Sequence, residues 1–277
     1  MNGIKYLFKL SRPRFWLYLA GPVLVGIAYG ASSTQDLLSL TSLILFLYFL
    51  VPANIVLYGV NDIFDAEIDE LNPKKEDKEV RYTGDTLVVA SVLLSLFMGL
   101  GLFLVLPPPT WPWLLGFFIL GIGYSTPPLR LKTTPLLDSV SNVLYVLPGG
   151  AAYSALAGVQ PPLLAVLGGL LWTMAMHTFS AIPDIGPDRE AGIRTTATFL
   201  GERRTYAYCA LLWLGSAVCF GALDIRAGIL LGVYPVLVIL IALSRIDVKR
   251  AYWWYPFVNS FVGMILTMGG LWGLVYG

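Results

Sequence analysis

Apolar residues fill long runs of the chain, and short polar or Pro- and Gly-bearing segments separate these runs. A helix needs about 20 apolar residues to cross a hydrocarbon layer of about 30 Å. Runs of roughly this length cover residues 13–31, 37–60, 86–106, 112–126, 137–157, 162–182, 205–223, 227–244 and 254–276. The pattern therefore predicts an all-α membrane protein with nine transmembrane helices, of which the fourth is short.

Composition agrees with this pattern. The 277 residues are 57% hydrophobic and only 13% charged, whereas soluble domains carry about 25% charged residues. A lipid bilayer is therefore the expected solvent. The net charge is +1, and the chain has no long basic run, so we do not expect a nucleic-acid partner.

Charged residues separate to one side of the predicted membrane. With nine spans, 17 of the 18 Lys and Arg residues fall beside the N-terminus or in the loops after even-numbered spans, and Arg226 is the exception. The positive-inside rule then places the N-terminus in the cytoplasm and the C-terminus outside. Of the 17 acidic residues, only Asp36 and Asp224 fall on the outer side. This bias predicts a carboxylate-using site that faces the cytoplasm.

The first candidate motif follows the second predicted span. It contains Asn61, Asp62, Asp65 and Asp69. If the helix continues, the three carboxylates share one face and repel each other unless a cation binds them. Carboxylates suit Mg²⁺, which usually bridges to substrate phosphates. A solvated acidic loop is the alternative interpretation.

A second motif, Asp184 and Asp188, follows the sixth predicted span, with Arg189 and Arg194 behind it. Its i, i+4 spacing also predicts two carboxylates on one face. Both motifs lie at cytoplasmic span ends, so we expect them to face one another across the bundle. Two Mg²⁺ ions between them would bind a diphosphate.

Basic and polar residues on the same side are candidates for contacting that diphosphate. Tyr124, Arg130 and Lys132 close the fourth span, and an arginine can bind phosphate oxygens in bidentate fashion. Arg14 is a further candidate before the first span, although anchoring at the membrane surface explains Arg12 and Arg14 equally well. His177, the single histidine, lies within the sixth span seven residues before Asp184. Substrate binding and ordinary packing are both open for it.

Taken in order, these motifs resemble the signatures of the UbiA superfamily of intramembrane prenyltransferases. The matching residues are Asn61, Asp62, Asp65 and Asp69, then Tyr124, Ser125, Arg130 and Lys132, then Asp184 and Asp188. The resemblance implies a single domain over residues 1–277, with nine helices around a central cavity and two pseudo-repeated halves, roughly 1–135 and 136–277. It also implies prenyl transfer from an allylic diphosphate to a lipophilic acceptor in the bilayer.

Several longer stretches resemble the lycopene elongase subgroup, among them 11–16, 58–65 and 180–192. This resemblance implies dimethylallyl diphosphate as the donor and lycopene or a related acyclic carotenoid as the acceptor. An aromatic or quinone precursor, a porphyrin and a lipid glycerol remain alternative acceptors. An ion-conducting transporter is a different class, but it predicts ionisable residues at mid-membrane depth, where this chain has few besides His177.

Overall fold

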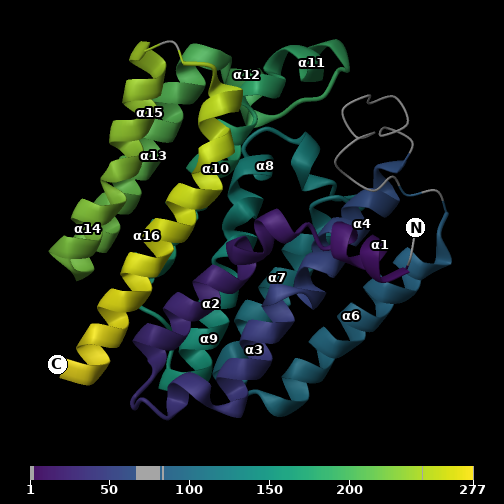
Figure 1. Cartoon of the computed structure of the whole chain (residues 1–277). Helices are drawn as coiled ribbons and strands as arrows, with labels where there is room; N and C mark the ends of the chain where they lie inside the picture. Colours follow the sequence, from purple (N-terminus) through teal and green to yellow (C-terminus); the bar gives the residue numbers. More distant parts are fainter. Residues whose placement is uncertain (1–2, 67–81, 83, 245, 277) are drawn as a thin grey trace. The chain divides into compact units, whose positions relative to one another are not determined.

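The computed structural model describes residues 3–66, 82, 84–244 and 246–276. Within these ranges every regular element is an α-helix or a short 3-10 helix, labelled η (Figure 1). The predicted all-α class is therefore confirmed. The contacts divide the chain into two compact units, which are described separately.

The first unit contains residues Met1–Arg130, Leu147–Gln160 and Thr267–Gly277. Its described elements are α1 (Gly3–Leu10), η1 (Pro13–Phe15), α2 (Trp16–Gly30), η2 (Asp36–Leu38), α3 (Leu40–Leu50), α4 (Pro52–Phe64), α6 (Thr86–Val105), η4 (Pro108–Thr110), α7 (Trp111–Gly123) and α9 (Leu147–Ala157). Pro52 begins α4 directly after α3, because proline has no N–H to continue the preceding helix. The α4 helix packs against α6. The first motif lies at the end of α4.

The second unit contains residues Leu131–Val146 and Pro161–Leu266. Its elements are η5 (Leu131–Thr133), α8 (Leu137–Val140), η6 (Ser141–Tyr145), α10 (Leu163–Ser180), η7 (Ile182–Asp184), α11 (Ile185–Glu190), α12 (Thr196–Leu200), α13 (Glu202–Leu223), α14 (Ile225–Leu231) and α15 (Val233–Ser244). The long helix α16 (Val248–Tyr276) begins in this unit and ends in the first. The close packing of α10 on α13 forms the middle of this unit.

Six segments of the described chain are long and apolar enough to cross a bilayer. They are Leu40–Phe64, Thr86–Val105, Leu163–Glu190, Glu202–Leu223, Ile225–Ser244 and Val248–Tyr276. The other three predicted spans, 13–31, 112–126 and 137–157, contain shorter helices; α2 has 15 residues and α7 has 13. The multi-pass pattern is thus present, while the count of nine stays a prediction.

The predicted continuous helix over 137–157 is wrong, because the chain forms α8, η6 and α9 there instead. Local side-chain bonds explain the interruption. The Asp138 carbonyl accepts hydrogen bonds from the Asn142 amide at 2.5 Å and from the Ser141 hydroxyl at 3.3 Å. Short polar side chains that bond to nearby backbone compete with regular helix formation in this way.

Glycines allow α2 and α9 to approach closely in the first unit. A side chain at Gly26 would collide with the Gly149 carbonyl oxygen. One at Gly30 would lie only 2.8 Å from the Tyr153 carbonyl oxygen. Small residues serve the same purpose at contacts between membrane helices, where close backbone approach replaces side-chain interdigitation.

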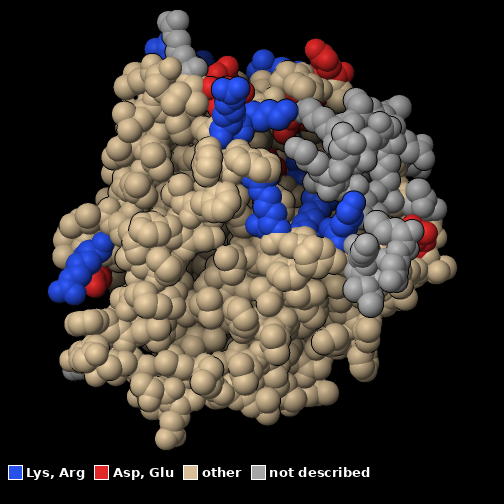
Figure 2. Space-filling view, viewed as in Figure 1, with Lys and Arg blue, Asp and Glu red and all other residues tan. Residues whose placement is uncertain are grey.

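Large apolar side chains remain exposed along the candidate spans. On α6, Phe97 is 74% exposed and Leu104 is 89% exposed. The face in Figure 2 is covered mostly by residues that are neither acidic nor basic. In a bilayer this surface contacts lipid chains rather than water, and the backbone hydrogen bonds are satisfied within the helices.

Candidate functional site

The first motif lies at the end of α4. Asp65 follows the last helical residue, Phe64, as its C-cap, with φ −102° and ψ 1°. Helix α4 therefore ends at Phe64. The shared face of Asp62, Asp65 and Asp69 stays a prediction. Asp69 lies outside the described residues. Asp62 and Asp65 are both buried, with 3% and 9% of their surface exposed.

Asp62 is paired with Arg12, which lies between α1 and η1. The guanidinium Nη2 donates to Asp62 Oδ1 at 2.9 Å. The same guanidinium lies 4.5 Å from the ring centroid of Tyr58, one helical turn before Asp62 on α4. Arg12 thus contacts a carboxylate and an aromatic face on one side of α4, and both contacts fix its position.

Asp65 is paired with a second arginine. Arg130 Nη2 donates to Asp65 Oδ1 at 3.3 Å. Arg12 and Arg130 also share an uncommon backbone conformation, with φ of 48° and 36°. Positive φ strains a non-glycine residue by about 1–3 kcal/mol and persists only where the surroundings impose it. Both arginines thus contact the motif from turns with this uncommon backbone conformation.

Asn61 completes the described part of the first motif. Its amide Nδ2 donates to the hydroxyl oxygen of Ser125 at 2.9 Å. Ser125 is buried and follows Tyr124, the C-cap of α7, which is half-buried. The structure thus brings Asn61, Asp62, Asp65 and Arg130 together at the end of α4.

The remaining basic candidates lie differently. Arg14 is exposed, with its guanidinium 5.8 Å from the Phe15 ring centroid. Arg12, two residues earlier, contacts Asp62, although the sequence analysis did not select it. The half-buried Lys132 lies in η5 of the second unit. Arg12 has a positive φ, which turns the chain between α1 and Pro13. The pattern of basic residues in the sequence gives no signal of this turn.

Asp85 is another carboxylate of the first unit and can be compared with those of the first motif. Tyr6 donates to Asp85 at 3.0 Å, just before α6 begins. Burial, followed by the hydrogen bond to Asp85, raises the pKa of Tyr6 above its ordinary value. Tyr6 therefore remains a neutral donor at pH 7. Asp85 lies outside both motifs.

The second motif lies where α10 gives way to shorter helices. Asp184 ends η7 and is the N-cap of α11, and Asp188 lies in the first turn of α11. Both are half-buried, whereas Arg189 and Arg194 are exposed. Arg189 Nη2 donates to the Thr198 carbonyl at 2.9 Å, which ties α11 to α12. Arg189, Arg194, Thr198 and Phe199 help to line an open depression of about 350 Å³.

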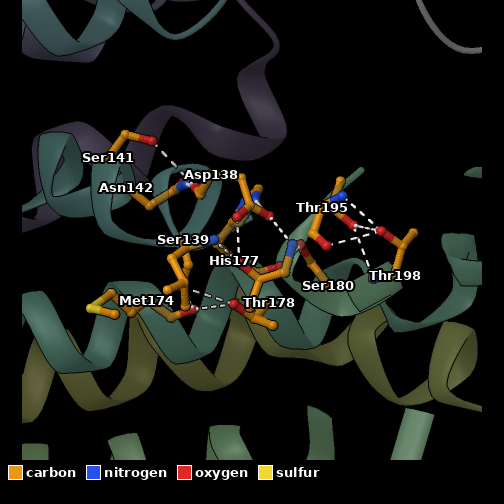
Figure 3. A network of polar contacts seen from close by, with 12 residues as sticks. Asp138, Ser139, Ser141, Asn142, Met174, His177, Thr178, Ser180, Thr195 and Thr198 are labelled. Carbon is orange, nitrogen blue, oxygen red and sulfur yellow. Dashed lines mark hydrogen bonds and ion pairs between the residues drawn. The ribbon is translucent and has the colours of Figure 1, made fainter. Parts of the chain in front are cut away.

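A polar network just before this motif was missed by the sequence analysis (Figure 3). His177, near the end of α10, has its Nε2 atom 3.7 Å from Oδ2 of Asp138, a wholly buried carboxylate on α8. Asp138 also accepts from the backbone N–H of Thr196 at 2.9 Å and from the Thr196 hydroxyl. The available signal was an acidic residue at the edge of a predicted span, which is costly unless it has partners.

Two further features concern metal-binding side chains and aromatic residues. Within the described ranges no three His, Cys, Asp or Glu side chains cluster closely enough to hold a metal ion by themselves. Phe179 is completely buried, with its ring 4.8 Å from that of Tyr255 and 5.7 Å from that of Trp213. Phe179 therefore belongs to the aromatic core of the second unit.

Comparison with known proteins identifies the family. The model of the UbiA prenyltransferase family matches residues 19–260. A lycopene elongase/hydratase of Haloferax volcanii is 63% identical over 276 residues, covering 100% of this chain and 92% of that protein. Another of that name, from Halobacterium salinarum, is 59% identical and covers 99% of each chain.

The fold agrees with a solved structure as well. A UbiA homolog from Archaeoglobus fulgidus, bound to DMAPP and Mg²⁺, matches with a TM-score of 0.75 at 20% identity, over 96% of this chain and 99% of that one. At this identity the likeness concerns the fold. The family match spans most of the sequence, and two relatives near 60% identity cover almost all of it. The chain therefore belongs to the UbiA prenyltransferase family and is a multi-pass membrane prenyltransferase.

Proposed function

We propose that this prenyltransferase transfers a dimethylallyl group from dimethylallyl diphosphate to lycopene or a related acyclic carotenoid, in a reaction that requires Mg²⁺. The observation that carries the acceptor is the 63% identity, over the whole chain, to a lycopene elongase/hydratase. The donor and the metal are supported by the DMAPP and Mg²⁺ bound to the structural neighbour.

The donor set fits the metal. Mg²⁺ in phosphate-transfer sites usually takes one or two carboxylates, with substrate phosphates and water as its other ligands. Asp62 and Asp65 lie at the end of α4, so the described part of the first motif supplies carboxylates of this kind. We assign Asp62, Asp65, Asp69, Asp184 and Asp188 to Mg²⁺ binding. When bound, Mg²⁺ supplies positive charge to the leaving diphosphate. We infer that two ions are used.

Arg12 and Arg130 are positioned to act on the same group. In the structure each guanidinium neutralises one motif carboxylate. A guanidinium has five N–H donors, so one group can bind both a carboxylate and a phosphate oxygen. We propose that these donors bind diphosphate oxygens and stabilise the charge that develops there as the C–O bond breaks. Tyr124, Arg189, Arg194, Lys132 and Asn61 are the remaining assigned substrate contacts.

Departure of diphosphate leaves an allylic carbocation. The π electrons of a terminal double bond of the acceptor then form the new C–C bond and leave a tertiary cation. This cation either loses a proton or binds water that itself loses a proton. An apolar enclosure is required, because water would otherwise quench the first cation. The largely apolar helices of the chain provide such surroundings.

We also propose a topology for the enzyme. It folds as one catalytic domain in the cell membrane, with nine spans, the N-terminus in the cytoplasm and the C-terminus outside. The charge distribution supports this arrangement, since Arg226 is the single basic residue on the predicted outer side. Both motifs then face the cytoplasm, where a water-soluble diphosphate is available.

Product analysis tests the function. The chain is expressed in a lycopene-producing host, and carotenoids are identified by mass spectrometry. We expect products heavier than lycopene by one and two C5 units, with or without added water. Membranes are also incubated with labelled dimethylallyl diphosphate and lycopene in competition with aromatic, porphyrin and glycerol acceptors. Label in any of these instead of lycopene would contradict the proposed acceptor, and ion flux without label transfer would favour a transporter.

A further inference from the structure

Asp138 reaches both ends of the segment that carries the second motif. That segment runs from His177, seven residues before Asp184, to Thr196, eight residues after Asp188. The Asp138 carboxylate lies 3.7 Å from the imidazole Nε2 of His177 and accepts two hydrogen bonds from Thr196. We propose that Asp138 is a positioning residue for prenyl transfer. Its contacts with His177 and Thr196, called the clasp below, hold this segment so that Asp184 and Asp188 are correctly placed for the Mg²⁺ diphosphate.

The burial of Asp138 means that its carboxylate requires compensating partners. Its side chain is completely buried, and a buried charge is very unfavourable unless hydrogen bonds and an opposite charge compensate it. Thr196 supplies both a backbone and a hydroxyl donor, and His177 supplies a group that can become cationic. The carboxylate therefore retains its place in a dry interior because of the two residues that flank the motif.

The chain beside Asp138 is shaped to complete this arrangement. Leu136 has a φ of 70°, a conformation that a leucine rarely adopts. Its N–H donates to the Thr196 hydroxyl oxygen at 2.8 Å, while that hydroxyl donates to Asp138. Thr196 then begins α12, capped by the Thr195 hydroxyl, which accepts from the Thr198 N–H. The strained residue and the cap both fix the far end of the motif segment.

The neighbouring residue Ser139 has a different set of partners. Its hydroxyl bonds to the Met174 carbonyl at 3.1 Å and to the Thr178 hydroxyl at 2.9 Å (Figure 3). It also bonds to the Tyr208 hydroxyl at 3.2 Å. These bonds hold α8 to α10 and α13 and reach neither Thr196 nor the His177 ring. Ser139 is equally buried. A substitution there disturbs the same short helix without releasing the clasp.

This role resembles that of residues that hydrogen-bond to the ligands of a metal ion and hold them in place. Such partners do not touch the metal, but their loss typically lowers metal affinity or activity about 10–100-fold, because the ligands are no longer held in place. The proposal rests on the proposed function, in which Asp184 and Asp188 bind the Mg²⁺ diphosphate. It adds a residue that acts through them and that no family motif in the sequence contains.

The first test uses binding without an acceptor. Thermal stabilisation of the detergent-purified enzyme by inorganic diphosphate with Mg²⁺ is measured for the wild type, Asp138→Ala, Asp138→Asn and Ser139→Ala. We expect the half-maximal Mg²⁺ and diphosphate concentrations to rise about 10–100-fold in Asp138→Ala, to rise less in Asp138→Asn, and to stay within about twofold in Ser139→Ala. If inorganic diphosphate with Mg²⁺ does not stabilise the wild type, the proposed function is contradicted. If it stabilises the wild type and Asp138→Ala equally, only the positioning role of Asp138 is contradicted.

The second test uses turnover and a milder pair of variants in case Asp138→Ala does not fold. Thr196→Val removes the hydroxyl that bonds to the carboxylate, and Thr196→Ser retains it. We expect Thr196→Val to raise the KM for the prenyl donor more than it lowers kcat, and Thr196→Ser to restore wild-type values. The proposal would be overturned if the Asp138 variants and Thr196→Val bound Mg²⁺ and diphosphate as the wild type does and had its KM for the prenyl donor. The same losses in Ser139→Ala would also overturn it.

Discussion

Arg12 donates a hydrogen bond of 2.9 Å to the carboxylate of Asp62, although 50 positions separate the two residues in the sequence. The pair joins the start of the chain to the first motif at the end of α4. Asp62 is 3% exposed, and removing one partner of a buried ion pair typically costs about 3–5 kcal/mol. We therefore expect Arg12 to contribute to stability, in addition to the diphosphate contact proposed for it.

The first prediction compares Arg12 with Arg14. Arg12→Ala should lower the apparent Tm in detergent and raise the KM for the prenyl donor, because Asp62 loses its partner and the diphosphate loses a donor. Arg12→Lys should recover much of the Tm but little of the KM, because lysine keeps the charge without the guanidinium fork. Differential scanning fluorimetry and donor titrations measure the two effects.

Arg14→Ala is the matched control for these variants. Arg14 is exposed, with its guanidinium 5.8 Å from the Phe15 ring centroid. We expect its Tm and donor KM to remain close to wild type. A donor KM that rises in Arg14→Ala and not in Arg12→Ala would reverse the assignment and restore the interpretation made from the sequence.

The second prediction concerns Asp62 itself. Asp62→Asn keeps the size of the side chain and can still accept a bond from Arg12, but it removes the charge that Mg²⁺ requires. We expect turnover to fall by about 100-fold or more while the protein remains folded in membranes. Labelled dimethylallyl transfer at saturating Mg²⁺ measures the loss. Asp85→Asn alters a carboxylate bonded to Tyr6 and should retain activity; near-normal turnover of Asp62→Asn would exclude the metal assignment.

The residues of the first motif were predictable because clustered carboxylates at the end of an apolar helix are unfavourable without a cation. Arg130 was predictable for a related reason, as a basic residue closing a span on the same side. Arg12 was not, because its role depends on a turn with a φ of 48° that the basic pattern does not encode. Sequence pattern thus identified the charges that need partners, while backbone geometry selected the partner.

The helices show the same limit. Hydrophobic runs predicted the six long apolar segments, whose boundaries follow composition. The run over 137–157 gave no warning that Ser141 and Asn142 bond to the Asp138 carbonyl and interrupt the helix. Asp138 was therefore counted as one more acid near the cytoplasm, and its link to Thr196, 58 positions away, was invisible without the fold.

The third prediction tests the close contact of α2 with α9. Gly26→Ala places a methyl group against the Gly149 carbonyl oxygen, and overpacking of this kind typically costs about 1–3 kcal/mol. We expect a lower Tm in detergent. Gly21→Ala on the same helix meets no atom within 4 Å and should be neutral or slightly stabilising, since alanine favours a helix over glycine. Equal Tm values for the two variants would contradict the contact.

The last prediction decides whether α7, with 13 residues, crosses the membrane. Ser33 and Thr134 are exposed and flank the predicted spans 37–60, 86–106 and 112–126. Three crossings place them on opposite sides. In a background with Cys209→Ala and Cys219→Ala, we expect a membrane-impermeant maleimide to label Ser33→Cys in intact cells and Thr134→Cys only after lysis. If both cysteines are labelled in intact cells, α7 does not cross, and the nine-span topology with an outer C-terminus must be replaced.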